Sequence, residues 1–131
     1  MTKVLVDTDI LIDHLRTGGG PLTQLVTMQS NGKIEIYLSS ITVMELYAGL
    51  SSLKLAKKIQ LLLNSFLVIP FDVTVAQFAG ELKRDQKFPT VPVVDYIIGS
   101  TAVWFKAQLA TRNRRHFSSI PELKFFDYLV L

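Results

Sequence analysis

Short apolar runs that alternate with amphipathic stretches most constrain what this chain can fold into. The first run, Val4–Val6, is short and mostly β-branched, and it ends at the acid Asp7. Such continuous apolar runs are typical of strands that are buried on both faces of a parallel sheet. Apolar residues at helical spacing follow at once, at Ile10, Leu11 and Leu15. The start of the chain therefore predicts a β-strand followed by an α-helix.

The same alternation continues along the chain. Further strands are predicted at 33–40, 66–71, 107–111 and 123–131, and helices at 22–30, 41–49, 54–66, from 72 onward, and from 92 to 105. Ser40 is expected to cap the helix at 41–49, and Pro92 suits the first turn of the helix from 92 to 105. Strands that alternate with helices predict an α/β fold with a central, mostly parallel sheet.

Composition limits the possible classes of protein. The 131 residues fit one domain, predicted to span 1–131, and 49% of them are hydrophobic. Because there is no cysteine, disulfides and thiolate metal sites are excluded. Without a long apolar span or a signal segment, we expect a cytoplasmic protein with no membrane partner. A formal charge of +3 permits a polyanionic partner without requiring one.

Four polar residues follow predicted strands or begin predicted helices: Asp7, Glu45, Asp95 and Asn113. In open parallel sheets, ligands bind beyond the carboxyl ends of the strands, so these side chains could share one edge. Clustered carboxylates repel one another unless a cation lies between them, and oxygen ligands favour Mg²⁺ or Mn²⁺. A helix cap at Asp7 and a half-exposed helix position at Glu45 are the simpler alternatives.

Other polar residues border the same predicted edge. Thr8, Ser40 and Thr111 are hydroxyls at the same predicted strand ends, where helix capping explains them. Asp9 is expected to cap the first helix or to support the site without binding the ion itself. Asp13 is expected to be a solvated helix residue.

Basic residues cluster just after the predicted strand at 107–111. Arg112, Arg114 and Arg115 could hold the phosphates of a polyanionic partner there, or they could simply be solvated loop residues. A helix-packing or phosphate-neighbouring role is expected for His116, because a lone histidine is weak evidence of catalysis. The lysines at 54, 57 and 58 are predicted to form a solvated helix face.

Four stretches, in order, give the chain a family resemblance: VLVDTDILIDHL, LSSITVMELYAGL, VPVVDYIIGSTA and LATRNRRHFSSIPELKF. The chain resembles PIN-domain ribonucleases, most closely the VapC-type toxins of type II toxin–antitoxin pairs. This resemblance implies a three-layer α/β/α, PIN-like (Rossmann-like) fold and a Mg²⁺- or Mn²⁺-dependent endoribonuclease. It makes Asp7, Glu45 and Asp95 metal ligands and, with Asn113, catalytic residues. It also implies that Thr8, Ser40 and Thr111 support the acids or bind a water and that Arg112, Arg114 and Arg115 bind RNA. Asn113 occupies the fourth acidic position, a departure that puts a tightly bound second metal in doubt.

The resemblance also implies partners. A cognate antitoxin is expected to lie across the protein and block the acidic edge, and RNA is the expected substrate. A homodimer and a toxin–antitoxin hetero-oligomer are expected as assemblies. The apolar residues proposed for the antitoxin groove are Leu46, Tyr47, Leu50, Leu53 and Leu62.

Two other interpretations compete with the nuclease. One is a PIN fold that has lost activity and serves as an interaction module, since the fourth acid is missing. The other is a receiver-like phosphoacceptor domain, whose acid pair Asp7 and Asp9 could imitate. A receiver also needs a lysine after the last strand, and the sequence QLATRN supplies none.

Overall fold

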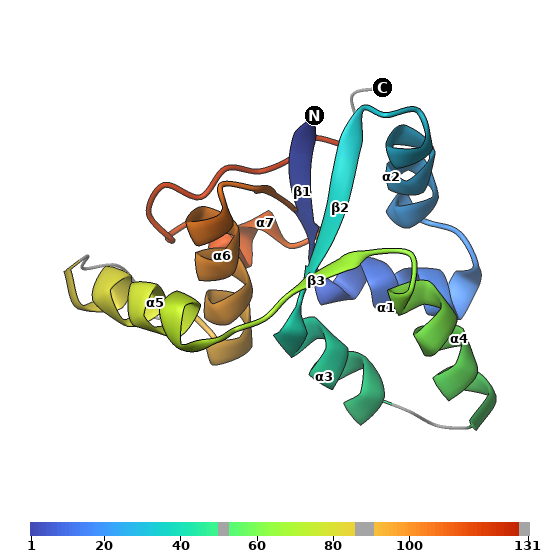
Figure 1. Cartoon of the computed structure of the whole chain (residues 1–131), viewed down its shortest axis with the longest axis horizontal. Coiled ribbons are helices and arrows are strands. Elements are labelled where there is room, and N and C mark those ends of the chain that lie inside the picture. Colours follow the sequence, from blue (N-terminus) through green and yellow to red (C-terminus); the bar gives the residue numbers. More distant parts are fainter. Residues whose placement is uncertain (50–52, 86–90, 129–131) are drawn as a thin grey trace.

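The computed structural model describes residues 1–49, 53–85 and 91–128 (Figure 1). Its strands are β1 (Thr2–Val6), β2 (Ile34–Ser39), β3 (Leu67–Ile69) and β4 (Gln108–Ala110). Its helices are α1 (Thr8–Thr17), α2 (Pro21–Ser30), α3 (Ser40–Ala48), α4 (Leu53–Leu63), α5 (Val73–Asp85), α6 (Val93–Phe105) and α7 (Arg114–Phe117). Within the described ranges, no helix has the length and apolar character needed to cross a membrane.

The strands form one parallel sheet in the order β3-β2-β1-β4. β1 lies inside this sheet, and its residues Val4, Leu5 and Val6 are fully buried. The chain adds β2 and β3 on one side of β1 and β4 on the other, so the strand order reverses at β1. In sheets of this kind the reversal leaves a crevice beyond the carboxyl ends of the strands. Here Asp7 and Thr111 directly follow the carboxyl ends of β1 and β4, and their side chains are in contact.

Helices cover both faces of the sheet (Figure 1). On one face α1, α2 and α4 pack around a core that includes Ile10, Leu25 and Ile59. On the other face α5, α6 and α7 enclose a second core that includes Ile98 and Phe117. The predicted three-layer α/β/α fold is therefore confirmed.

Local signals explain several boundaries. α1 ends at Gly18, whose φ of 73° is left-handed and favours glycine. Pro92 directly precedes α6, as predicted. The cap of α3 was predicted wrongly: the Ser39 hydroxyl accepts the N–H of Ile41, and Ser40 is already helical. The lysines at 54, 57 and 58 are exposed, as expected for a solvated face.

The edge of the sheet beside β4 differs from the prediction. Residues 123–128 form no strand, and Phe125 makes only an isolated parallel bridge to Leu109. The backbone hydrogen bonds there run from Leu109 N to Lys124 O and from Phe126 N to Leu109 O, both 2.8 Å long. The last part of the predicted strand, 129–131, lies outside the described residues.

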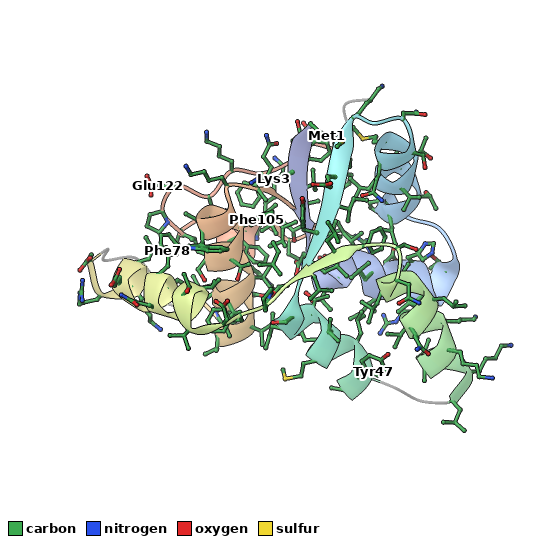
Figure 2. All side chains as sticks on the ribbon, viewed as in Figure 1. Met1, Lys3, Tyr47, Phe78, Phe105 and Glu122 are labelled. Carbon is green, nitrogen blue, oxygen red and sulfur yellow. The ribbon has the colours of Figure 1, made fainter. Side chains whose placement is uncertain are left out.

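The opposite end of β1 is fastened to α6. Lys3 Nζ donates to the carbonyl oxygen of Phe105 at 2.7 Å and lies 4.1 Å from the centre of its ring (Figure 2). A cation at a helix C-terminus is favourable because the free carbonyls there carry partial negative charge. This contact fixes α6 along β1, with the N-terminus of α6 and Asp95 directed toward the carboxyl edge of the sheet.

Candidate active site

Asp7 lies at the carboxyl end of β1 and is the N-cap of α1. Only 5% of this residue is exposed. Its Oδ1 accepts the N–H of Thr8 at 2.8 Å, and its Oδ2 accepts the hydroxyl of Thr111 at 2.7 Å. Since each carboxylate oxygen has two lone pairs, both oxygens can still bind another group. The carboxylate is therefore fixed in place and able to act as a ligand.

The charge on Asp7 is unfavourable in this setting. Burial raises the pKa of Asp7 from 3.8 to about 7, with smaller upward contributions from the charges of Asp9 and Asp95. The hydrogen bonds from Thr111 and Thr8 act in the opposite direction. A nearby cation would favour the ionised form of this carboxyl group.

Glu45 reaches the site through a chain of hydroxyls. Its Oε1 accepts a hydrogen bond from Thr8 Oγ1 at 2.6 Å. Thr8 Oγ1 is also 2.9 Å from Thr42 Oγ1. A hydroxyl carries one proton, so when Thr8 donates to Glu45, Thr42 must donate to Thr8. The sequence interpretation missed Thr42, although it lies three residues before Glu45 and thus on the same helix face.

Asp95 lies in the first turn of α6 and is half-buried. Its Oδ2 is 3.4 Å from Nδ1 of His116. Burial raises the pKa of Asp95, while His116 acts to lower it. His116 is thus a direct neighbour of a predicted ligand, which the sequence alone did not reveal.

The side-chain amide of Asn113 is hydrogen-bonded to Asp9. Its Nδ2 donates to Asp9 Oδ2 at 2.9 Å, and its side chain makes no capping bond to α7. Asp9 is in the first turn of α1, so its predicted capping role is wrong, because Asp7 is the cap. Asp9 Oδ1 is shielded from solvent without a hydrogen bond, and burial raises the pKa of this acid.

The three arginines behave differently from one another. Arg112 Nη1 lies 3.2 Å from Asp13 Oδ1, so Asp13 is an ion-pair partner and its predicted role as a merely solvated residue is wrong. Arg114 lies against Phe125, 5.3 Å from the ring centre, and donates to the Phe126 carbonyl oxygen at 3.4 Å. Arg115 is exposed.

The four predicted segments do reach one edge of the sheet, but not as a closed cage of ligands. In the part of the chain that the structure describes, no three His, Asp or Glu side chains converge closely enough to hold an ion. The donor set nevertheless suits Mg²⁺, which binds through one or two carboxylates and keeps several waters. Ser40 is apart from this set, because its hydroxyl accepts the N–H of Phe71 at 2.9 Å.

Comparison with known proteins assigns the fold to a family. The family model described as PIN domain matches residues 4–123. The chain belongs to the PIN-domain family. This match removes the receiver-like alternative, which also lacks the lysine it would need directly after β4, where the sequence reads TRN.

Its relatives include ribonucleases. The PIN domain is 32% identical over 122 residues to ribonuclease VapC19 of Mycobacterium tuberculosis, covering 92% of this chain and 96% of that protein. It is 33% identical over 123 residues to ribonuclease VapC10 of the same organism, covering 92% of this chain and 90% of that protein. These matches place the chain in the VapC branch of the family.

Solved structures agree with this placement. VapBC2 from Rickettsia felis, bound to a DNA fragment from its promoter, matches with a TM-score of 0.82 and 26% identity, covering 95% of this chain and 98% of that chain. DNA-bound VapBC from Salmonella typhimurium matches with a TM-score of 0.77 and 26% identity, covering 98% of this chain and 99% of that chain.

The raised pKa of Asp7 predicts an unusual pH dependence of stability. The folded state holds the Asp7 proton more tightly than the unfolded chain does, so ionisation destabilises the metal-free protein as pH rises from about 4 to about 7. At pH 8, Asp7→Asn should therefore raise the free energy of unfolding, by about 2 to 4 kcal/mol at 1.4 kcal/mol per pKa unit. Urea denaturation of both proteins in EDTA measures this.

The comparison is made at pH 4.5 and pH 8, because other acids titrate in both proteins. The advantage of Asp7→Asn over the wild type should grow between these values. An equal advantage at both pH values would mean that Asp7 ionises at its ordinary pKa.

Proposed function

We propose that this PIN domain is an endoribonuclease that depends on Mg²⁺ or Mn²⁺ and acts as the toxin of a toxin–antitoxin pair. The names of its relatives, ribonucleases VapC19 and VapC10, support the activity. The carrying observation is the buried Asp7 carboxylate, whose pKa is raised by burial and by the charges of Asp9 and Asp95. Folding keeps this unfavourable group at the carboxyl edge, which is expected where a cation binds.

Asp7, Glu45 and Asp95 are the residues that would hold the cation. When bound, a divalent ion supplies positive charge that makes water more acidic and stabilises the oxygens of the reacting phosphate. Two of the three acids are already oriented: Thr111 and the Thr8 N–H fix Asp7, and the Thr8 hydroxyl fixes Glu45. This orientation reduces the rearrangement needed when ion and RNA arrive.

The surrounding residues have separate tasks. Arg115, exposed on α7, binds RNA phosphates as a guanidinium can. Asn113 orients water at the edge through its Oδ1, while its Nδ2 stays hydrogen-bonded to Asp9.

The ends of the cleaved RNA identify the route of attack. Attack of water on phosphorus, with departure of the 3′ oxygen, leaves a 5′-phosphate and a 3′-hydroxyl. Attack by the RNA 2′-hydroxyl would instead leave a 5′-hydroxyl, so the ends distinguish the two routes.

An inactive interaction module is the remaining alternative. It is favoured by the amide at Asn113 in place of an acid and by the open arrangement of the described acids. The two functions differ in one observation, which is metal-dependent cleavage of bulk RNA.

Neutralising the acids tests the activity. Asp7→Asn and Asp95→Asn keep the size of the side chain and remove its charge, so each should reduce cleavage of total RNA by at least about a hundredfold. Circular dichroism checks that both variants fold. The control is Asp85→Asn, an exposed acid on α5 paired with Arg84, which should cleave normally.

Sequencing of the cleaved ends supplies the second readout. The proposal expects 5′-phosphates that depend on added Mg²⁺ or Mn²⁺ and vanish with EDTA. Full cleavage by Asp7→Asn would contradict the metal assignment, and a folded wild type without any cleavage would favour the interaction module.

A hollow between α1, α3 and α4 fits the expected antitoxin. Its apolar wall is formed by Ile12, Leu15, Leu46, Leu55 and Ile59, it has a volume of about 190 Å³, and it also contacts Glu45. A wider hollow of about 650 Å³ continues from it along α1 and α4 and is bordered by three basic residues, His14, Arg16 and Lys58. The partner segment should therefore carry apolar side chains with acids between them.

The residues predicted to form the antitoxin groove lie at different places relative to this hollow. Leu46 is buried beneath it and Leu62 lines its wider part. Tyr47 and Leu53 are exposed (Tyr47 is labelled in Figure 2), and Leu50 lies outside the described residues. An occupant of the groove would lie beside Glu45, and so could block the acidic edge. The solved VapBC structures, which contain both proteins of such pairs, support an antitoxin partner.

Charge reversal in this groove tests the partner. Lys58→Glu should weaken the complex with the antitoxin at least about tenfold, because like charges across an interface are repulsive. Co-expression with the small open reading frame next to the gene, followed by co-purification and growth measurement, provides the test. Lys124→Glu, which changes an exposed residue beyond β4, is the matched control. Equal rescue of growth for Lys58→Glu and Lys124→Glu would argue against this docking site.

Homodimer formation also stays a prediction. Its support is a set of exposed apolar side chains on α3, on β3 and at the start of α5 and α6, namely Met44, Leu67, Val68, Val73 and Val93.

A further inference from the structure

Three consecutive residues after β4 each bind an acid of the opening segment. Thr111 donates to Asp7 at 2.7 Å, and Asn113 donates to Asp9 at 2.9 Å. Between them, Arg112 pairs with Asp13 at 3.2 Å. The loop 111–113 thus lies along α1 with one contact for each of its residues. Of these acids, Asp7 is a proposed ion ligand, whereas Asp9 and Asp13 are not.

The surroundings of Asp13 restrict its position. One carboxylate oxygen, Oδ1, faces Arg112, and the other, Oδ2, lies against Gly20. A Cβ at position 20 would be 2.3 Å from Asp13 Oδ2, and Gly20 has a φ of 82°. Only a glycine leaves this space while adopting that backbone conformation. Asp13 therefore lies between the turn after α1 and the guanidinium of Arg112.

The ion pair is too exposed to matter much for folding. The Arg112 side chain is 51% exposed and that of Asp13 is 25% exposed, and pairs near the surface contribute little to stability. The ion pair can still affect the reaction through the position of the loop, because small displacements of groups around a reacting centre can slow a reaction greatly. The neighbours of Arg112 in the chain are Thr111 and Asn113, which contact Asp7 and Asp9.

We propose that Asp13 is a positioning residue that acts through Arg112 to hold loop 111–113 at the acidic edge. The proposal rests on the ribonuclease function. It removes Arg112 from the predicted RNA contacts and gives it a role within the protein. An arginine that binds RNA phosphate affects KM and the salt dependence of binding, whereas one that holds the loop affects kcat.

A double-mutant cycle tests this role. Asp13→Asn and Arg112→Gln should each lower kcat about tenfold and change KM less than about twofold, and the double variant should be no slower than the slower single variant. The melting temperature should change little. Asp85→Asn, which alters a different exposed Asp–Arg pair, should leave kcat and KM unchanged. Independent effects of the two substitutions, or a raised KM for Arg112→Gln alone, would overturn the proposal.

Amide hydrogen exchange separates this proposal from the nuclease assignment. In Asp13→Asn, exchange at residues 111–116 should become at least about threefold faster, with β1 and β2 unchanged, because a less restrained loop opens more often. Unchanged exchange in the loop would overturn the proposal whatever the activity. Faster exchange together with an inactive wild type would instead uphold the role of Asp13 and refute the ribonuclease function.

Discussion

The burial of one carboxylate, Asp7, at the carboxyl end of β1 is the constraint on which the site depends. The apolar run before it is fully buried in a strand inside the sheet, so the next residue lies at the carboxyl edge beside β4. The N–H of Thr8 and the hydroxyl of Thr111 fix the carboxylate there. Burial raises its pKa to about 7, and the nearby acids Asp9 and Asp95 add to the shift. The fold thus maintains a carboxyl group whose charged form is unfavourable at this place.

The same arrangement links stability to function. A neutral side chain at position 7 would fold more easily at neutral pH, yet it would lose the strongest reason for a cation to bind. Such trade-offs are common where activity needs an unfavourable group. The loop 111–113 shares in this arrangement, since its Thr111 holds Asp7 and its Asn113 is bound by Asp9. The chain belongs to a family whose VapC members are named as ribonucleases, and the proposed chemistry accounts for why Asp7 is kept.

The sequence predicted the elements well wherever a local pattern determines them. The buried run at β1, the stripe of α4 and the glycine after α1 gave correct elements. The assignment of Asp7, Glu45 and Asp95 as ion ligands stays a prediction. Contacts between distant segments were not readable. Asp13 has the pattern of a solvated helix residue until β4 brings Arg112 beside it. The strand expected at 123–131 has the right composition, but in the described part only Phe125 bridges to β4.

The capping error at α3 has a similar origin. Ser39 and Ser40 are equivalent in sequence, and only the approach of Phe71, whose N–H donates to Ser40, decides which hydroxyl is free to cap. Thr42 was missed because its role appears only when α3 packs beside Thr8.

Proton release on metal binding shows whether the ion binds to the ionised carboxylate of Asp7. With a pKa of about 7, Asp7 is mostly protonated at pH 6, so Mg²⁺ or Mn²⁺ should displace about one proton when it binds. Calorimetric titration at pH 6 in two buffers of different ionisation enthalpy measures this number. The wild type should release close to one proton. The Asp7→Asn variant should release none from this position and should bind the ion much more weakly. Metal binding without proton release, or equal binding by Asp7→Asn, would contradict it.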